Sequence, residues 1–394
     1  MNRAFTLLIS TAIFSFACAS PAPTGLSENK VVSTKSAKPS DAGTEVLAEV
    51  KFKVETVATG LEVPWGFAFL PDDKMLLTER PGRVRLIEKG KLRDEVVFKV
   101  PDVEPSSESG LMDISIHPKF EENKFVYMAY AYNDDGKQVK VVRYTFDGEM
   151  LKEDKIIIDK IPGAPNHAGT RCRIGPDGKL YVTTGDATDW DLAQKTNSLA
   201  GKTLRLNDEG SVPEDNPFVD NPKYRPEIWT IGHRNAQGLA WQPGSGLMFQ
   251  TAHGPSYFEG KGGGGDEVNI VEKGKNYGWA EISHTETREG MESPLLEYSP
   301  ACAPASGMFY TGDKFPEFKG NFFFGCLRGT RIIRVKLDGR KVIGQEDLLK
   351  GNFGRIREMG EGPDGYIYFS TSNRDGRGRP TEDDDRILRI VPAD

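Results

Sequence analysis

A strand, a tight turn and a second strand recur six times along the chain after residue 51. Each copy has an apolar run, a turn rich in Pro, Asp or Gly, and a second run rich in β-branched or aromatic residues. The copies cover residues 66–78, 114–128, 173–182, 239–249, 307–324 and 362–369. Their spacing of about 45 to 70 residues is the period of propeller blades with variable loops. We therefore expect an all-β fold, a six-bladed β-propeller of four-stranded antiparallel blades.

Packing between blades is the physical reason for this choice. A four-stranded blade cannot bury both of its faces alone, but it can bury them between two neighbours in a closed ring. Residues 125–132 are apolar at nearly every position, as expected for a strand covered on both faces. The last strand, 386–391, should complete a blade with the first, near 52–56. No long segment has a period of 3.6 residues, so helices should be short and few.

The length and the net charge of the chain limit the kinds of molecule that it is expected to bind. With 394 residues and 37% hydrophobic content, the chain can bury a large core. Its formal net charge of -7 comes from interleaved acidic and basic residues, which offer no basic surface to a polyanion. Nucleic acid is therefore not an expected partner.

The first 48 residues differ in composition from the rest. Arg3, an apolar stretch over 4–17 and Cys18 after a small residue predict a targeting segment over 1–18, similar to a bacterial lipoprotein signal. Ser15 departs from that pattern, so two alternatives stay open: a lipid anchor at Cys18, or plain secretion. Residues 19–48 should form a disordered tether and 49–394 the propeller. The expected location is the periplasm or an outer-membrane anchor, with secretion as the second choice, and membrane contact is expected only through Cys18.

Three further cysteines, Cys172, Cys302 and Cys326, allow at most one disulfide within the chain. Cys302 with Cys326 is the favoured pair. The alternative is that all three are buried thiols that pack as small hydrophobes.

Polar side chains gather in three loops next to the repeats. They occupy 166–171, 232–238 and 253–255. Strand ends of a propeller converge on one mouth, so these loops should face a single central pocket.

These loops belong to an ordered series of motifs: Gly201–Asn207, Pro213–Phe218, Gly232–Gly238, Asp266–Ile270 and Lys275–Trp279. In this series the chain resembles the glucose/sorbosone dehydrogenase family over about residues 61–391, and within it the bacterial soluble aldose sugar dehydrogenases. The resemblance implies oxidation of aldose sugars at C1 to lactones. Hydride would pass to pyrroloquinoline quinone (PQQ) held with Ca²⁺, and electrons would then pass to an external acceptor.

The resemblance also implies roles for individual residues. His167 matches the catalytic base that takes the proton of the C1 hydroxyl, and an imidazole suits that task near neutral pH. Arg234 and Asn235 match residues that bind the quinone, and the Arg234 guanidinium can stabilise negative charge on the reduced cofactor. Glu108 and Asn166 fall on the substrate side.

Further guanidiniums match cofactor-binding positions. Arg355 and Arg357 correspond to a pair that binds the PQQ carboxylates, and their period of two places both on one strand face. Arg328 falls where the family often has Lys, which keeps the charge but changes its geometry. Without the resemblance, Arg355 and Arg357 would be interpreted as a solvated strand face.

Calcium is implied at two places. The backbone carbonyls of Gly254 and Pro255 match ligands of the active-site ion, and Glu267 with the carbonyl of Tyr277 matches a second, structural site. The chain also departs from the family. Residues 256–265 form a longer and more Gly-rich loop than is usual, and 298–307 lack a Trp often found over the cofactor.

Two other functions remain open. One is a catalytically silent propeller that binds a carbohydrate or a protein, and the other is a Ca²⁺-dependent lactonase. The combination of His167, Arg234, Arg355 and Arg357 favours the dehydrogenase, because a binding module has no need of that set.

Overall fold

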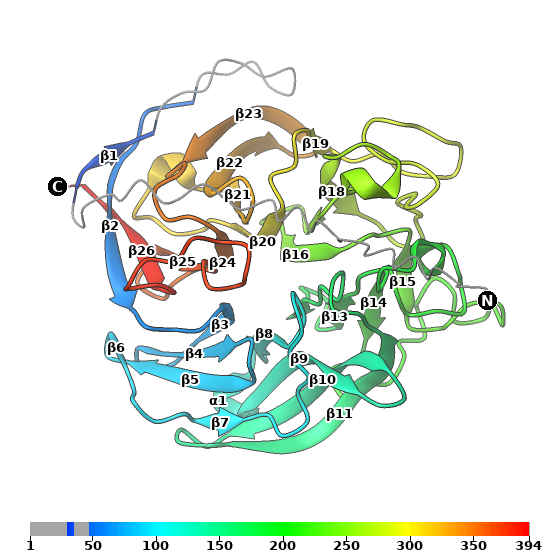
Figure 1. The fold of residues 1–394 in the computed structure, drawn as a ribbon, viewed down its shortest axis with the longest axis horizontal. Coiled ribbons are helices and arrows are strands. Elements are labelled where there is room, and N and C mark those ends of the chain that lie inside the picture. Colours follow the sequence, from blue (N-terminus) through cyan, green and yellow to red (C-terminus); the bar gives the residue numbers. More distant parts are fainter. Residues whose placement is uncertain (1–29, 35–46, 394) are drawn as a thin grey trace, which may run out of the picture.

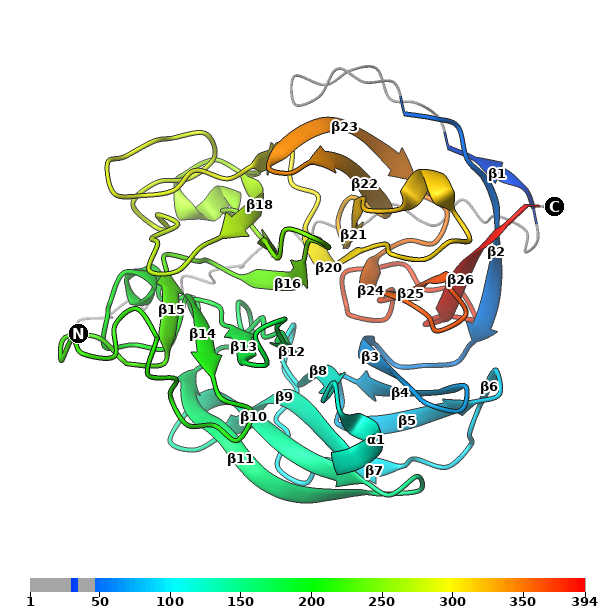
Figure 2. The ribbon, with the colours of Figure 1, turned by 180° about the vertical axis from the view of Figure 1, so that it is seen from behind.

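A computed structural model describes residues 30–34 and 47–393 of the protein. The strands of these residues form six antiparallel sheets arranged radially around a central axis (Figure 1), and the opposite view shows the same ring from behind (Figure 2). The six repeated hairpins of the sequence are the two innermost strands of the six blades. The expected six-bladed propeller is therefore confirmed.

The first three blades follow one another along the chain. Blade 1 contains β3 (Pro64–Leu70), β4 (Lys74–Glu79) and β5 (Arg83–Glu88), with β6 (Lys91–Leu92) and β7 (Phe98–Lys99) both paired to β5. Blade 2 contains β8 (Leu111–Ile116), β9 (Phe125–Asn133), β10 (Lys137–Phe146) and β11 (Leu151–Pro162), with the four-residue helix α1 (Phe120–Asn123) between β8 and β9. Blade 3 contains β12 (Cys172–Ile174), β13 (Leu180–Thr183), β14 (Lys202–Leu206) and β15 (Ile228–Ile231), and carries the 3-10 helix η1 (Trp190–Ala193).

The other three blades complete the circle. Blade 4 contains β16 (Ala236–Trp241), β17 (Met248–Ala252), β18 (Asp266–Val271) and β19 (Leu296–Tyr298), with the 3-10 helix η2 (Tyr257–Glu259). Blade 5 contains β20 (Pro304–Phe309), β21 (Phe322–Cys326), β22 (Arg331–Asp338) and β23 (Lys341–Leu348), with η3 (Pro316–Phe318). Blade 6 contains β24 (Ile356–Glu361), β25 (Ile367–Thr371), β26 (Ile387–Pro392), β2 (Lys51–Ala58) and β1 (Val32–Ser33).

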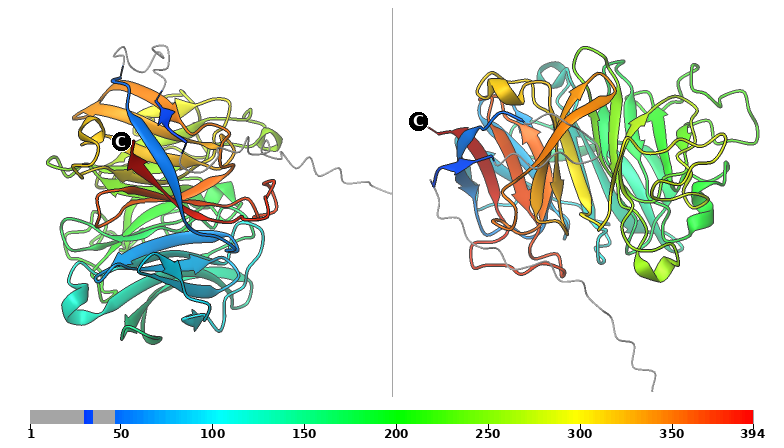
Figure 3. Two further views of the ribbon diagram at one scale, coloured as in Figure 1. Left: turned by 90° about the vertical axis from the view of Figure 1, so that its left-hand side faces the viewer. Right: turned by 90° about the horizontal axis from the view of Figure 1, so that it is seen from above.

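The two ends of the domain close the ring within blade 6. β2 pairs with β26 from Phe52 opposite Pro392 to Thr56 opposite Leu388, and the two strands lie side by side at the rim (Figure 3). This pairing confirms the expectation for the first and last strands. It also joins the two ends of the domain, because β2 completes a blade whose inner strands come from the C-terminal part of the chain.

A short stretch of the predicted tether is ordered, which corrects the expectation of disorder over 19–48. β1 pairs with β2, with Val32 opposite Phe52, and Thr34 Oγ1 accepts a 2.9 Å hydrogen bond from Val50 N. β2 is the outer strand of its blade, so its unpaired backbone groups offer a ready edge to this segment. The targeting segment 1–18 lies outside the described residues.

The hydrophobic core lies between neighbouring blades. Every residue of β9 from Val126 to Tyr132 is buried, as expected for a strand covered on both faces. Tyr127 of that strand packs in one cluster with Leu180 and Leu204 of blade 3. No helix among residues 30–34 and 47–393 is long and apolar enough to cross a membrane.

Buried charged groups fill the axis of the ring. The guanidinium of Arg171 contacts four other blades: it binds Asp113 Oδ1 at 2.9 Å, Gln237 O at 2.5 Å and the carboxylate of Glu358, and lies 4.4 Å from the Trp65 ring centre. A single residue can reach four other innermost strands only from the axis. Glu358 also accepts a hydrogen bond from Ser306 Oγ of blade 5 at 2.9 Å. We call this group of residues the axial ion cluster.

The three cysteines outside the targeting segment are buried free thiols. Cys302 and Cys326 nevertheless lie in hydrogen-bonding contact. The structure therefore agrees with the alternative of packed thiols rather than with the favoured disulfide. The two cysteines of the favoured pair are therefore neighbours in the fold, although they form no disulfide.

Candidate functional site

His167 lies at one mouth of the ring, in a group of contacting residues that we call the cup: Glu108, Asn166, His167, Asp186, Arg234, Asn235, His253, Arg355, Arg357 and Arg377. His167 belongs to the segment between β11 and β12, has a left-handed backbone with φ of 53°, and is 8% exposed. Its Nδ1 lies 2.8 Å from Asp186 Oδ1, beyond the end of β13. A carboxylate can only accept at this atom, so the proton sits on Nδ1 and Nε2 is left as the basic nitrogen.

Asp186 is held from two further sides. Its Oδ2 accepts a 2.8 Å hydrogen bond from Trp279 Nε1, and its Oδ1 accepts one of 2.8 Å from Thr188 N. Asp186 is fully buried, so these donors and the imidazole satisfy a charge that would be costly to leave unpaired. Sequence reasoning missed Asp186 and Trp279, because only the fold brings residues 167, 186 and 279 together.

Gly185 allows His167 to take this position. A Cβ built on Gly185 would collide with the carbonyl oxygen of His167. The Gly185 carbonyl in turn accepts a 2.7 Å hydrogen bond from Gly201 N of the family-like motif. Any larger residue at 185 would therefore displace the backbone of the predicted base.

Glu108 connects three parts of the cup. Its carboxylate lies 3.3 Å from His167 N, 3.4 Å from Asn235 Nδ2 and 3.1 Å from Arg377 Nη1. Burial alone would raise the pKa of Glu108, but Arg377, His167 and His253 together with the hydrogen bond from His167 N outweigh it, and the pKa falls to about 2. Glu108 is therefore an anion at neutral pH.

Asn166 lies beside Glu108, on the same wall. Its Oδ1 accepts hydrogen bonds from Ser107 Oγ at 2.8 Å and from Arg377 Nη2 at 2.9 Å. The structure thus brings together the two residues predicted on the substrate side. It adds Arg377 from blade 6, which the sequence had not indicated.

Arg234 faces the cup from the loop before β16. Its Nη2 lies 2.8 Å from Glu259 Oε2 and its Nε 3.2 Å from Oε1, and both side chains are buried. Glu259 belongs to the unusually long loop 256–265, where η2 is capped by Ser256. The indole of Trp279 lies 5.4 Å from the guanidinium.

Asn235 and His253 line the bottom of the cup beside Arg234. Asn235 Oδ1 accepts a 3.1 Å hydrogen bond from Gly169 N, and His253 Nε2 lies 3.0 Å from Pro304 O. Burial lowers the pKa of His253 to about 3, so this ring is neutral and donates to the carbonyl. His233, in contrast, is a core residue that stacks on Tyr277 and bonds Thr230 and Gln250.

Arg355 and Arg357 form the opposite wall, and the expected common face is confirmed. Arg355 Nε lies 2.7 Å from Asp375 Oδ2, and Arg357 Nη2 lies 3.8 Å from the same oxygen. Burial first, then the neighbouring guanidinium, lowers the pKa of Arg357 to about 9. Two buried guanidiniums share the one carboxylate of Asp375, so these three groups carry a net positive charge. They fit the carboxylates of an anionic planar cofactor such as PQQ.

The Gly254–Pro255 segment is fixed by Asp266. Asp266 Oδ1 accepts from Gly254 N at 2.8 Å, and Oδ2 accepts from Cys302 N and Ala303 N at 2.6 Å each. The carbonyl oxygens of Gly264 and Gly265 lie so close to the Gly254 Cα that no side chain would fit there. Of the two predicted ligand carbonyls, Pro255 O accepts a 3.3 Å hydrogen bond from Gly264 N, and Ca²⁺ binding by this pair stays a prediction. The described residues contain no group of three or more His, Cys, Asp or Glu side chains suited to a metal.

The second predicted calcium site involves the Glu267 side chain and the Tyr277 carbonyl. Glu267 pairs across the sheet with Glu297, and burial together with the charge of Asp266 raises the pKa of Glu267 to about 7. Two carboxylates at facing positions would accept a cation. The Tyr277 side chain packs on His233 and its hydroxyl bonds Ile270 O at 2.6 Å, which leaves the predicted ligand, its backbone carbonyl, as a prediction.

Arg328 lies at the same mouth of the ring as the other predicted residues, because its turn follows Cys326, which pairs with Pro304 beside His253. It is exposed in the turn between β21 and β22, and no hydrogen bond or ion pair joins it to them within the described part of the chain. Its role in cofactor binding stays a prediction.

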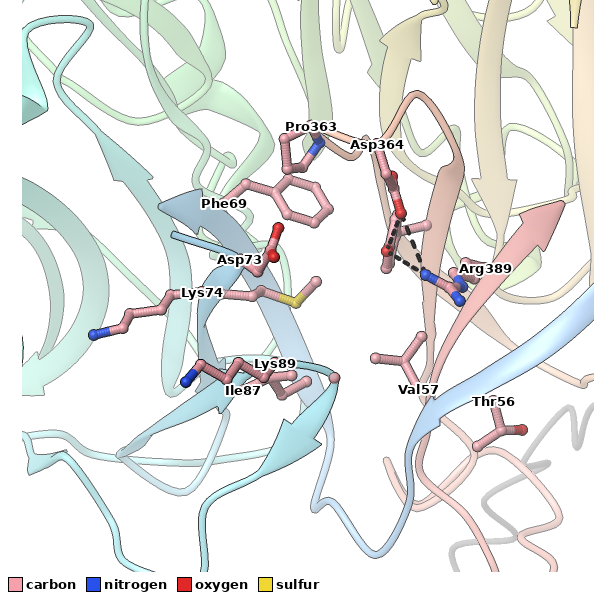
Figure 4. Close-up of a pocket in the computed structure, with 13 residues that line it drawn as sticks. Thr56, Val57, Phe69, Asp73, Lys74, Ile87, Lys89, Pro363, Asp364 and Arg389 are labelled. Carbon is pink, nitrogen blue, oxygen red and sulfur yellow. Dashed lines mark hydrogen bonds and ion pairs between the residues drawn. The ribbon is translucent and has the colours of Figure 1, made fainter. Parts of the chain in front are cut away.

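The opposite end of the ring carries a different cavity. A hollow of about 480 Å³ lies between blades 1 and 6, where Arg389 bonds Asp364 and Tyr368 (Figure 4). Pro363 and Asp364 follow the end of β24, whereas Arg355 and Arg357 stand at its start. None of the residues predicted from the sequence for the site lines this cavity.

The chain is similar to known proteins over most of its length. Residues 61–388 match the sequence profile of the family described as Glucose / Sorbosone dehydrogenase. Aldose sugar dehydrogenase YliI of Escherichia coli (strain K12) is 34% identical over 349 residues, which cover 84% of this chain and 92% of that protein. A solved structure from Thermus thermophilus, described as an oxidoreductase and glucose dehydrogenase, is 41% identical, with a TM-score of 0.80 over 86% of this chain and 100% of that one. The PQQ-bound aldose sugar dehydrogenase of Streptomyces coelicolor is 32% identical, with a TM-score of 0.75 over 87% and 98% of the two chains.

Proposed function

This chain belongs to the glucose/sorbosone dehydrogenase family, and on that premise we propose that it oxidises aldose sugars at C1 to lactones with PQQ and Ca²⁺. One observation carries the proposal. The His167–Asp186 pair lies at 2.8 Å in a cup whose walls hold Arg234, Arg355 and Arg357. A base with a fixed tautomer next to several buried guanidiniums suits oxidation of a hydroxyl beside an anionic acceptor.

His167 acts as the base. With its proton held on Nδ1 by Asp186, Nε2 takes the proton of the C1 hydroxyl. Asp186 then stabilises the imidazolium that forms, because its carboxylate lies in direct contact with the ring. The buried position of the pair excludes water from the carboxylate and strengthens this interaction.

Three guanidiniums hold the cofactor. Arg355 and Arg357 bind its carboxylates, and Arg234 with Asn235 binds the quinone edge. When bound, PQQ would supply the acceptor for the hydride from C1, and Ca²⁺ would supply a Lewis acid beside it. Gly254 and Pro255 offer the backbone oxygens for that ion.

Glu108 and Asn166 orient the sugar. The Glu108 carboxylate, ionised at neutral pH, accepts from sugar hydroxyls close to His167. Asn166 and Arg377 supply an acceptor and donors on the same wall. The set fixes C1 toward Nε2.

A propeller that only binds a carbohydrate is the alternative. Sugar binding needs acceptors, donors and aromatic faces, but it does not need a base whose tautomer is fixed by a buried carboxylate. The His167–Asp186 pair therefore favours the enzyme.

The proposal includes a place and a partner for the reaction. We propose that the chain works in the periplasm or on the outer membrane, with Cys18 as the lipid anchor. Its electrons pass to an external acceptor.

Reconstitution tests the function. Purified protein is mixed with PQQ and Ca²⁺, and reduction of an artificial dye is followed with a panel of aldoses. We expect sugar-dependent reduction that requires both additions. His167→Gln should bind PQQ like the wild type and lose turnover. An absence of sugar-dependent reduction, with sugar binding retained, would support the binding propeller instead.

A further inference from the structure

A second hollow lies on the axis of the ring, at the mouth opposite the cup. Its volume is about 480 Å³, within the range of about 300–1,000 Å³ that small-molecule sites occupy. The innermost strand of each blade contributes one apolar residue toward its end: Phe69, Ile116, Ile174, Trp241, Phe309 and Met359. The cup residues Arg234 and Arg355 precede two of these strands, so the two ends of the strands face opposite mouths. We call this hollow the axial funnel.

Aromatic contacts hold the wall of the axial funnel in place. The ring of Trp241 packs edge to face on Tyr181 with centres 5.4 Å apart, and Phe69 packs in the same way on Tyr368 at 5.0 Å. Four of the six apolar side chains are partly exposed, so their surface is open to a ligand. A ligand would therefore meet an ordered wall and lose little of its binding energy to ordering the protein.

One positive side chain reaches the axial funnel from the axial ion cluster. Arg173 and Glu358 are the charged residues of the lining, and the Arg173 side chain is 22% exposed whereas that of Glu358 is 2% exposed. Arg173 also binds the carboxylate of Asp113, which is fully buried. The inner end of the funnel therefore presents a guanidinium, while both carboxylates are shielded from solvent.

The guanidinium of Arg173 keeps hydrogen-bond donors for a ligand. It has five N–H groups. Nη1 contacts Asp113 and the carbonyl oxygens of Ile114 and Cys172, and Nη2 contacts Glu358 Oε1 at 3.3 Å. Within the described residues, Nε has no hydrogen-bond or ion-pair partner. Nε and Nη2 form one edge of the planar group, and a carboxylate can bind such an edge with both of its oxygens.

Apolar walls around one positive group determine the class of ligand. A hydrocarbon without a polar group would displace water from the Arg173 donors and leave them unpaired. A dianion such as phosphate would lose the hydration of two charges beside a guanidinium that Asp113 and Glu358 already compensate. An amine would meet a like charge. A monocarboxylate with an apolar body matches both the walls and the inner end.

We propose that the axial funnel is a binding site for small apolar monocarboxylates. The carboxylate binds the Nε and Nη2 edge of Arg173, and the hydrocarbon body packs against Trp241 and the other five apolar side chains. The axial ion cluster separates this site from His167. The inference goes beyond the proposed oxidation and does not depend on it.

Titration calorimetry of the full-length protein tests the site with 4-phenylbutyrate as the probe. 4-Phenylbutanol and 4-phenylbutylamine carry the same apolar body with a neutral and a positive head group. We expect the acid to bind, the alcohol to bind at least tenfold more weakly, and the amine to give no measurable binding. Equal affinities for the acid and the alcohol, or no binding of the acid, would overturn the site.

Substitutions show where the acid binds. Trp241→Ala removes the largest ring of the wall and should weaken the binding of 4-phenylbutyrate about tenfold. Trp190→Ala is the matched control, because this ring is 37% exposed on the cup side of the ring and does not line the axial funnel. An unchanged affinity in Trp241→Ala, or equal losses in the two variants, would place the acid elsewhere and refute the proposal.

Arg173→Gln tests the head group directly. The variant should bind the acid no better than the alcohol, because the charge that distinguishes them is gone. A preference for the acid that survived this change would contradict the assigned contact. Trp241 forms no part of the axial ion cluster, so its variant decides the question even if loss of Arg173 destabilises the fold.

Discussion

Arg234 and Glu259 form a buried two-point ion pair, with Nη2 2.8 Å from Oε2 and Nε 3.2 Å from Oε1. The pair joins the loop 256–265 to the bottom of the cup. It places one anion next to a guanidinium expected to bind the cofactor. The long loop therefore sets the charge that Arg234 offers to a ligand.

Glu259→Gln should test that control. Removal of one partner leaves the Arg234 charge buried and uncompensated, so the free energy of unfolding should fall by about 3–5 kcal/mol. An anionic ligand can replace the lost carboxylate, so PQQ should raise the unfolding temperature more in the variant than in the wild type. Calorimetry with and without PQQ measures both effects. Equal PQQ-induced shifts in the two proteins would contradict the expectation.

Asp186→Asn should reduce turnover while cofactor binding survives. The amide can present its NH₂ group to Nδ1, which favours the tautomer with the proton on Nε2 and removes the basic nitrogen. We expect kcat to fall about 10²–10⁴-fold. Steady-state kinetics and fluorescence titration with PQQ separate the two effects. Trp279→Phe removes only the donor to Oδ2 and should cost less, and full activity in Asp186→Asn would disprove the assigned tautomer.

Gly185→Ala should act through the backbone of His167. The new methyl group would collide with the His167 carbonyl, so the segment must shift. A displacement of about 1 Å at a catalytic group lowers the rate about 100-fold. Gly178→Ala is the control for a general loss of stability, because Gly178 has a left-handed backbone but open space around its Cα, in the turn between β12 and β13. If both variants lost the same activity, the clash would not be the cause.

Glu108 should give the fold a defined acid sensitivity. Its pKa in the folded state, about 2, lies below the ordinary value of 4.5, so the folded state favours the carboxylate. This stabilisation, roughly 2–3 kcal/mol, is fully present above pH 4.5 and is lost as the pH falls toward 2. The difference in unfolding free energy between wild type and Glu108→Gln should therefore be constant near neutral pH and shrink between pH 4.5 and 2. Urea unfolding across that range measures it, and a difference independent of pH would refute the assignment.

The inner hairpin of each blade was predictable, because its strand–turn–strand pattern is a local property of the sequence. The outer strands were less predictable. β6 and β7 have only two residues each, and β1 lies in a polar stretch that was predicted to be a disordered tether. These segments are ordered by the exposed edges of neighbouring strands. Their sequences alone carry little β preference.

Only the site residues that stand in a recognisable sequence motif were predictable. His167, Arg234, Arg355 and Arg357 stand in recognisable motifs, and the structure brings them to one cup. Asp186, Glu259 and Arg377 come from other segments, and each is paired with a predicted residue across a distance that only the fold closes. Tyr277 stands in a motif as well, but its predicted role belongs to its backbone carbonyl and stays a prediction.

The axial ion cluster around Arg171 has a kinetic consequence. Charged side chains from opposite blades fill the centre of the ring. A small molecule therefore cannot reach the site along the axis from the opposite mouth. For the proposed reaction, sugar, lactone and electron acceptor would then all enter and leave through the same mouth of the ring. The proposed lactone would have to leave before the acceptor binds. Double-reciprocal plots at several acceptor concentrations should therefore be parallel, as in a ping-pong mechanism.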